Sequence, residues 1–251
     1  MPGRFFLATP VEALAPALDL LDGPLDAARR ASLAALPRLV PRYNIAPGQD
    51  IPIILPPLVP GERPAMKFAR WGLIPHWSAT PDVGVRTINI AAETIDDKLA
   101  PALRSRRCLV PADGFYEWRT LDASQKQPYL VRFCPPGERA PAPFVMAALW
   151  EEWTPRDGSP VTTVAILTTP SNSAIAPIHE RMPAVVPVSS MSKWLGERGE
   201  SSDAEGRAAH DLCRPYPAEL TSVQEVSRLV NSTRFDNPGC IRPVESRGAV
   251  Y

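Results

Sequence analysis

Short runs of apolar and β-branched residues recur through the middle of the chain and favour strands over long helices. These runs are five to eleven residues long, and several of them are separated by turns rich in Pro and Gly. The runs that predict strands are Ile51–Leu55, Met66–Leu73, Cys108–Trp118, Pro128–Phe133, Phe144–Trp150 and Val161–Thr169. The pattern therefore predicts a strand-rich body.

Helical spacing of apolar residues is confined to a few short stretches. Leu and Ala recur at helical spacing in Val11–Leu21, which Pro16 breaks or kinks, and in Leu25–Leu36. Further helices are predicted from about Glu93 to Ser105 and from Ser190 to Leu195.

The remaining pattern indicates one domain over residues 1–251, with a core from about residue 3 to 243. The polar stretch 197–209 is interpreted as an exposed insertion, no internal repeat is visible, and no change in composition marks a domain boundary. The predicted fold class is α+β: a strand-rich mixed sheet that closes into a barrel-like body, with short helices at its periphery.

Composition excludes several classes of protein. Pro accounts for 31 of 251 residues, which disfavours coiled coils and all-helical repeats. Lys plus Arg and Asp plus Glu are both 27, so nucleic-acid binding would need a local basic patch. The four Cys are far apart and are expected to be reduced, as in the cytoplasm. The longest apolar stretch, residues 51–60, is too short to cross a membrane.

Common catalytic motifs are missing from the sequence. The glycine-rich nucleotide loops, the paired-His zinc motif and the serine-hydrolase elbow do not occur. Of the three His, only His210 has a ligand-like partner, Cys213, and a second such pair is absent. We therefore expect no metal and no other cofactor.

Six segments are more particular than a scaffold requires. They are Gly3-Arg4-Phe5, Arg42-Tyr43-Asn44-Ile45-Ala46-Pro47-Gly48, Trp71-Gly72-Leu73-Ile74-Pro75-His76-Trp77, Ile88-Asn89 before Ala92-Glu93-Thr94, Pro111-Ala112-Asp113-Gly114-Phe115-Tyr116-Glu117-Trp118, and His179-Glu180-Arg181-Met182-Pro183. In this order they resemble the SOS response-associated peptidase (SRAP) family, the abasic-site processing proteins of single-stranded DNA. The resemblance extends from Gly3 to about Pro243.

The resemblance implies a specific chemistry, and the chain departs from it in two places. Members of the family lose the initiator Met and trap the aldehyde of an abasic site as a thiazolidine, using the amine and thiol of an N-terminal Cys. This chain has Pro2 at that position, so a stable crosslink cannot be carried over. The family's Asn-Ala-Arg is here Asn89-Ile90-Ala91, which lacks one expected phosphate-contacting Arg.

The residues that the resemblance marks as catalytic are Pro2, Asn89, Glu117 and His179. Aromatic neighbours of Glu117 would desolvate its carboxyl group and raise its pKa, which suits a proton carrier. His179 would donate a proton or balance a phosphate, and Asn89 would orient the amine. The alternatives are that Glu117 faces outward from a strand, that His179 is structural, and that Asn89 caps a turn or a helix.

Other positions of the motifs are predicted to contact DNA. They are Arg4, Asn44, Pro47, Arg86, Trp118, Thr168 and Arg181. Arg4 and Arg181 are the expected phosphate clamps, with a solvated surface charge as the alternative for either one. Trp118 would stack on a base, whereas Trp77 is interpreted as a core residue.

Two functions of different classes follow. The first is an abasic-site-reactive enzyme in which the Pro2 amine forms a transient Schiff base, with AP lyase activity but no durable crosslink. The second is a catalytically silent single-stranded DNA-binding module. A peptidase acting on other proteins is a weaker third reading, because no nucleophile motif is present. The expected partner is single-stranded DNA with abasic sites, bound by a monomer with no membrane association. The protein would be cytoplasmic and nucleoid-associated when on damaged DNA.

Overall fold

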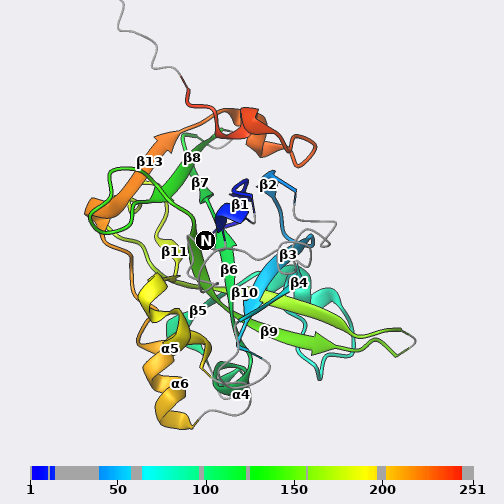
Figure 1. The fold of residues 1–251 in the computed structure, drawn as a ribbon. Helices are drawn as coiled ribbons and strands as arrows, with labels where there is room; N and C mark the ends of the chain where they lie inside the picture. The colour runs from blue at the N-terminus through cyan, green and yellow to red at the C-terminus, as the bar shows by residue number, and fades with distance from the viewer. Residues whose placement is uncertain are drawn as a thin grey trace, which may run out of the picture.

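Strands dominate the computed structural model and form two sheets (Figure 1). The structure describes residues 2–10, 12–14, 40–57, 64–95, 99–122, 125–156, 158–196 and 202–244. The five-stranded sheet has the order β13 (Thr221–Glu225), β8 (Lys126–Phe133), β7 (Gly114–Thr120), β1 (Arg4–Leu7) and β2 (Arg42–Ile45). All of its pairings are antiparallel.

The second sheet closes into a barrel. Its closed ring consists of β10 (Val161–Pro170), β4 (Ala65–Trp71), β3 (Asp50–Leu55), β6 (Arg107–Ala112) and β9 (Phe144–Trp153). Closure occurs because β10 pairs in parallel with β4 on one side and antiparallel with β9 on the other. Three short strands extend this sheet: β5 (Asn89–Ala91), β11 (Arg181–Pro183) and β12 (Val185–Val186). The predicted α+β fold with a barrel-like mixed sheet is confirmed.

Most predicted strands appear with shifted ends, and one of them is divided. The run Cys108–Trp118 forms β6 and β7, which belong to different sheets and meet at Asp113. The Asp113 carboxylate accepts hydrogen bonds from the backbone N–H groups of Ala8 and Thr9, at 2.6 and 2.7 Å. This contact fixes the end of β1 at the junction between the sheets. Apolar continuity along the sequence did not reveal the change of sheet.

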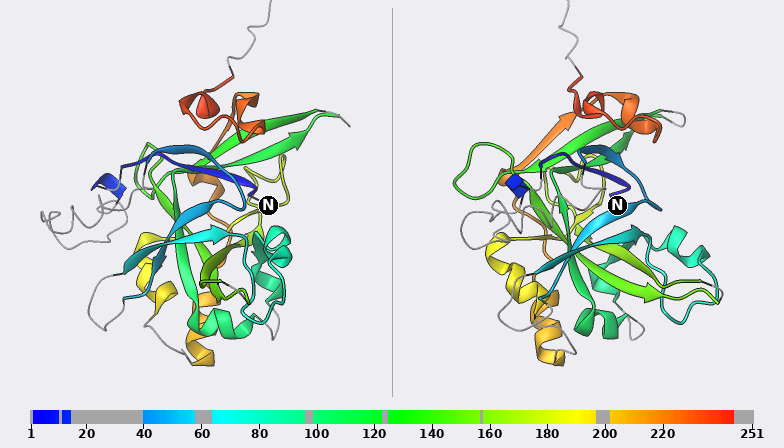
Figure 2. Two further views of the ribbon diagram at one scale, coloured as in Figure 1. Left: turned by 90° about the vertical axis from the view of Figure 1, so that its right-hand side faces the viewer. Right: turned by 45° about the vertical axis from the view of Figure 1, so that its right-hand side comes forward.

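Helices are short and lie outside the barrel (Figure 2). They are α3 (Asp82–Arg86), α4 (Ala100–Ser105), α5 (Met191–Leu195) and α6 (Asp203–His210), with single 3₁₀ turns η1 (Ala92–Thr94), η2 (Val188–Ser190), η3 (Ala218–Leu220), η4 (Arg228–Asn231) and η5 (Pro238–Ile241). The predicted helix at 190–195 is confirmed as α5. The continuous helix predicted from Glu93 to Ser105 is wrong, because Ile95 is extended and Pro101 stands at the start of α4, where a preceding helical turn is disfavoured.

The helices predicted before residue 40 lie almost wholly outside the described residues. Only residues 12–14 are described there, and they are helical. The stretch 197–209, interpreted from the sequence as an exposed insertion, contains most of α6. Gly206 and Ala209 of that helix are buried, and it packs against α4 and α5.

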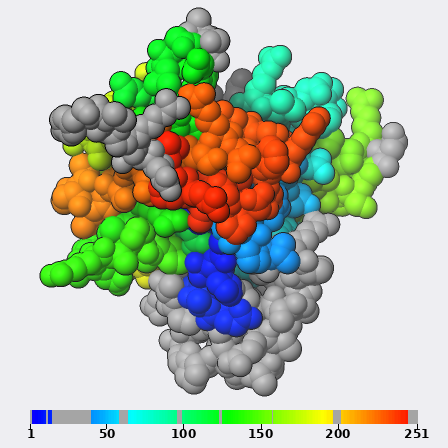
Figure 3. Space-filling view, turned by 90° about the horizontal axis from the view of Figure 1, so that it is seen from above, coloured from blue at the N-terminus to red at the C-terminus, as the bar shows by residue number. Residues whose placement is uncertain are grey.

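Two apolar clusters hold the structure together. The larger cluster fills the barrel and the space between the sheets. The smaller one consists of Phe6, Tyr116, Leu130, Val226, Val230 and Cys240. It joins the five-stranded sheet to residues 226–243, which we call the C-terminal cap and which occupy the middle of the face seen from above (Figure 3). Among the described residues, no helix has the length and apolar character to cross a membrane.

A close backbone contact after β4 gives a test of this fold. Gly72 has a φ of 134°, and a Cβ atom at this position would lie 2.4 Å from the backbone oxygen of Gly84. Gly72→Ala should lower the free energy of unfolding by more than about 2 kcal/mol, measured by urea denaturation. The control is Gly206→Ala in α6, where a Cβ atom meets only Arg104 at 3.5 Å; it should be neutral or stabilising. Equal stability of the two variants would contradict the packing described.

Candidate functional site

The N-terminal end of the chain lies below the C-terminal cap in the views of Figures 1 and 2. Pro2 is buried, and its carbonyl oxygen accepts a hydrogen bond of 2.9 Å from Asn89 Nδ2. Asn89 is fixed in turn because β5 pairs with β10 at Ile166. Asn89 Oδ1 is buried and accepts no hydrogen bond from any described residue. A hydrogen-bond acceptor, Asn89 Oδ1, is therefore available close to the main chain of Pro2.

Glu117 lies on β7, the strand that pairs with β1. The register joins Arg4 to Tyr116, so its continuation brings Gly3 opposite Glu117. The Glu117 side chain is only 3% exposed. Burial raises the pKa of its carboxyl group, and the positive charge of the chain's amino terminus opposes this shift. The direction agrees with the prediction made from the aromatic neighbours.

His179 precedes β11 and faces the same end of the chain. Its Nδ1 atom accepts a 3.0 Å hydrogen bond from the backbone N–H of Arg181, so the neutral ring carries its proton on Nε2. Burial lowers the pKa of His179, and the positive charge of the amino terminus lowers it further. A neutral imidazole with a fixed tautomer is suited to donate a hydrogen bond through Nε2.

Arg181 and Thr168 are brought together at the end of β10. The Arg181 Nη2 atom donates to the backbone oxygen of Thr168 at 2.7 Å and to its hydroxyl oxygen at 3.1 Å. The same guanidinium forms a two-pronged ion pair with Glu93, with distances of 2.9 and 3.3 Å. Thr168 is fully buried, and Arg181 is partly exposed.

Arg4 and Asn44 lie together under the C-terminal cap. Arg4 Nη1 donates to Asn44 Oδ1 at 2.9 Å and to the carbonyl oxygen of Val230 at 3.0 Å, and burial lowers the pKa of the guanidinium. Asn44 Nδ2 donates to carbonyl oxygens of the cap, including that of Phe235 at 2.7 Å. The two residues therefore tie β1 and β2 to the cap.

The aromatic residues of the motifs occupy different environments. Trp118 is half-buried, and its Nε1 atom donates to Asn231 Oδ1 in the cap at 2.7 Å. Trp77 is 51% exposed and stacks edge-on against His76, so its interpretation as a core residue is wrong. It follows the last strand residue of β4 by six positions and lies in a surface loop. Arg86 is exposed at the end of α3.

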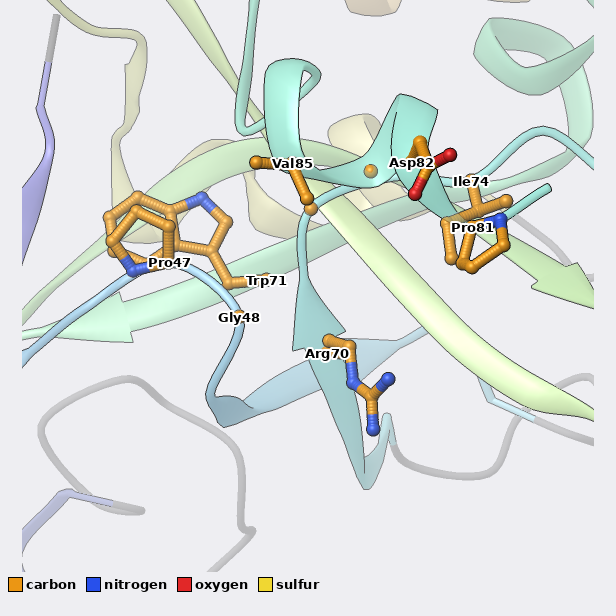
Figure 4. Close-up of a pocket in the computed structure, with 10 residues that line it drawn as sticks. Pro47, Gly48, Arg70, Trp71, Ile74, Pro81, Asp82 and Val85 are labelled. Carbon is orange, nitrogen blue, oxygen red and sulfur yellow. The ribbon is translucent and has the colours of Figure 1, made fainter.

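A pocket of about 330 Å³ lies between the end of β4 and α3 (Figure 4). Pro47 and Trp71 form one end of it, and Ile74 and Pro81 form the other. Trp71 links the pocket to the site, because its Nε1 atom donates to the carbonyl oxygen of Ile88, the residue before Asn89. Two of the sequence motifs supply half of its lining, and the pocket itself was not predicted.

Sequence reasoning also missed three polar residues that hold the site in place. Glu93 was quoted within a motif without a role, although it binds Arg181. Asn231 and Asp236 were not considered; Asp236 accepts from the backbone N–H groups of Tyr43 and Asn44. The sequence offered no pattern by which to find them, because isolated polar residues in a loop-rich segment have no periodicity.

Metal ligands and thiols do not gather at this site. In the parts of the chain that the structure describes, no three His, Cys, Asp or Glu residues are placed to hold a metal ion. The four cysteines are free thiols, and Cys108 is fully buried on β6, where burial raises its pKa well above the usual value.

These features define a class of protein: a barrel whose buried N-terminal segment meets an Asn, a buried Glu and a neutral His. The chain belongs to the SOS response associated peptidase (SRAP) family, whose profile matches residues 1–233. It is 35% identical to the abasic site processing protein YoqW of Bacillus subtilis over 205 residues, covering 80% of this chain and 85% of that protein. It is 33% identical to the abasic site processing protein HMCES of Gallus gallus, covering 83% and 68% of the two chains. A crystal structure of a protein from Bacteroides thetaiotaomicron has the same fold, with a TM-score of 0.74, 23% identity and coverage of 96% and 100%.

The buried carboxyl group makes stability depend on pH in a testable way. Because burial raises the pKa of Glu117, the folded state binds more protons than the unfolded state between the ordinary pKa of 4.5 and the raised value. The free energy of unfolding should therefore fall as pH rises through this window. Glu117→Gln should lose this contribution, so its stability relative to the wild type should increase with pH. Urea denaturation across this range measures the difference.

Glu225→Gln, at an exposed position of β13, is the control for removing one carboxylate. Parallel stability curves for Glu117→Gln and the wild type would show that the Glu117 carboxyl group is not desolvated.

Proposed function

We propose that this protein recognises abasic sites in single-stranded DNA and reacts with the ring-opened aldehyde through the amine of Pro2, exposed by removal of Met1. The observation that carries the proposal is the meeting of Pro2 with Asn89, close to the buried Glu117 and the neutral His179. Family membership supports the choice of substrate, because relatives at 33–35% identity are named abasic site processing proteins.

The chemistry starts with addition of the Pro2 nitrogen lone pair to the aldehyde carbon. The carbonyl oxygen takes up two protons and leaves as water, which gives a cationic iminium. Before this addition, His179 Nε2 would donate a proton to the sugar ring oxygen as the ring opens and releases the aldehyde. Ionised Glu117 would then remove a proton from the sugar carbon next to the iminium. The electron pair of the broken C–H bond would form a carbon–carbon double bond and expel the 3′ phosphate by β-elimination. Hydrolysis of the iminium returns the Pro2 amine.

Durable crosslinking is not part of the proposal. Closing a thiazolidine ring needs a thiol on the β-carbon of the N-terminal residue, and Pro2 has none. Cys108, the thiol nearest in the sequence to a family motif, is buried in the barrel. The adduct should therefore remain hydrolysable.

Binding of single-stranded DNA would rely on the residues around this site. Arg181 is the proposed phosphate contact, anchored by Thr168, and Arg4 and Arg86 would add positive charge. Trp118 would stack on a base in an orientation set by Asn231, and Pro47 would contact the strand beside the pocket. Asn44 would hold Arg4 in place. Stacking and phosphate contacts carry no sequence preference, which suits a protein that follows lesions.

Borohydride trapping tests the proposed reaction. Protein with an N-terminal Pro2, verified by intact mass, should form a stable amine with an abasic oligonucleotide when borohydride is present. Without borohydride the adduct should not survive heating in denaturant. Pro2→Ala presents a primary amine and should still be trapped, acetylation of the terminus should abolish trapping, and Pro2→Cys should give a heat-stable crosslink.

The same experiment also tests the alternative function, which belongs to a different class. If verified Pro2 protein binds single-stranded DNA in fluorescence anisotropy but gives no trapped adduct, the protein is a catalytically silent DNA-binding module. The replacement of the family's N-terminal Cys by Pro2 is the observation that favours this alternative.

Glu117→Gln and His179→Ala separate proton transfer from binding. Each should slow trapping by about 10²-fold or more and leave the affinity for intact single strands nearly unchanged. Equal losses of binding and reaction would instead indicate that the two side chains maintain structure.

A further inference from the structure

The guanidinium of Arg181, the proposed phosphate contact, is already occupied by a carboxylate. Glu93 Oε2 lies 2.9 Å from Nη2, and Glu93 Oε1 lies 3.3 Å from Nη1. This parallel arrangement is the one in which a guanidinium also binds two oxygens of a phosphate. Arg181 Nε is buried and has no partner among the described residues, so the two Nη atoms are the ones available to an anion.

The two partners differ in how firmly they are held. Arg181 is anchored by the backbone oxygen and hydroxyl of buried Thr168, and its side chain is 18% exposed. The Glu93 side chain is 47% exposed on the short turn η1. Glu93 can therefore rotate into solvent while Arg181 stays in place.

We infer that Glu93 acts as an internal competitor of DNA phosphate for Arg181, and that it limits the affinity of the protein for single strands. The inference deepens the proposed function and rests on it. A phosphate that binds Arg181 must displace Glu93, whose carboxylate then loses its partner. The absence of an Arg at position 91 strengthens this effect, because Ala91, the residue preceding η1, supplies no second cation for either anion.

The competitor has a thermodynamic signature beyond affinity. Phosphate binding releases cations from DNA, but a displaced Glu93 attracts a cation from solution and offsets part of this release. Glu93→Gln removes the offset. Its affinity should therefore depend more steeply on salt than that of the wild type.

The experiment measures binding of a fluorescein-labelled oligothymidylate by anisotropy at several salt concentrations. Glu93→Gln should bind about two- to fivefold more tightly than the wild type at 0.1 M salt, as expected for loss of a partly exposed ion pair. Glu180→Gln is the matched control: it removes the same charge next to Arg181, but no ion pair of Glu180 is found among the described residues. Its effect should be smaller, with no change in slope.

A double-mutant cycle distinguishes competition from general charge. In an Arg181→Met background, Glu93→Gln should change affinity no more than Glu180→Gln does. Glu93→Ala provides a second variant, and urea denaturation verifies that each variant is folded. An equal effect of Glu93→Gln and Glu180→Gln, or weaker binding by Glu93→Gln, overturns the competitor.

The failure of the inference and that of the proposed function are distinguishable. Binding by the wild type with no gain in Glu93→Gln overturns only the competitor. No binding by any variant overturns both, whereas binding that appears only in Glu93→Gln supports the competitor strongly.

Discussion

Strand β10 is the constraint on which the rest of the structure depends. Its first half pairs with β4 and β9 and closes the barrel, and its second half pairs with β5 and β11. The residues in the middle of the strand are fully buried. One strand therefore determines both the shape of the barrel and the positions of Asn89, Thr168 and Arg181. A shift of its register by one residue would exchange the side chains on its two buried faces and separate these three groups.

Low solvent exposure gives the polar groups of the site their chemical character. The carboxyl group of Glu117 and the imidazole of His179 both lie where burial disfavours charge, so one pKa rises and the other falls. The two groups therefore approach each other in proton affinity, although one is an acid and the other a base. Hydrogen bonds to backbone atoms then fix their geometry, as the contact of His179 with the N–H of Arg181 shows.

Sequence patterns predicted the barrel strands well because those strands are long, apolar and bounded by Pro-rich turns. Strands β1, β5 and β11 were not predicted, since three or four residues are too few for a period to appear. The same short strands carry Arg4, Asn89 and Arg181, which motif order identified as candidates and periodicity did not. Long-range contacts were out of reach: the pairing of Arg181 with Glu93 joins residues that are 88 positions apart. The interpretation of Trp77 as core failed because an aromatic residue in an apolar motif gives no indication that its loop leaves the barrel.

The contact between β1 and the C-terminal cap affects the order in which the chain can fold during synthesis. β1 cannot be enclosed until β7 has been made, and Arg4 obtains its carbonyl partner only when Val230 has emerged. At about 5 to 20 residues per second, this interval lasts on the order of 10 to 50 s. Arg4 is thus among the first residues to be translated, but its contact with Val230 is among the last to form. Arg4, two residues after Pro2, therefore obtains its last contact only when almost all of the described chain has been made.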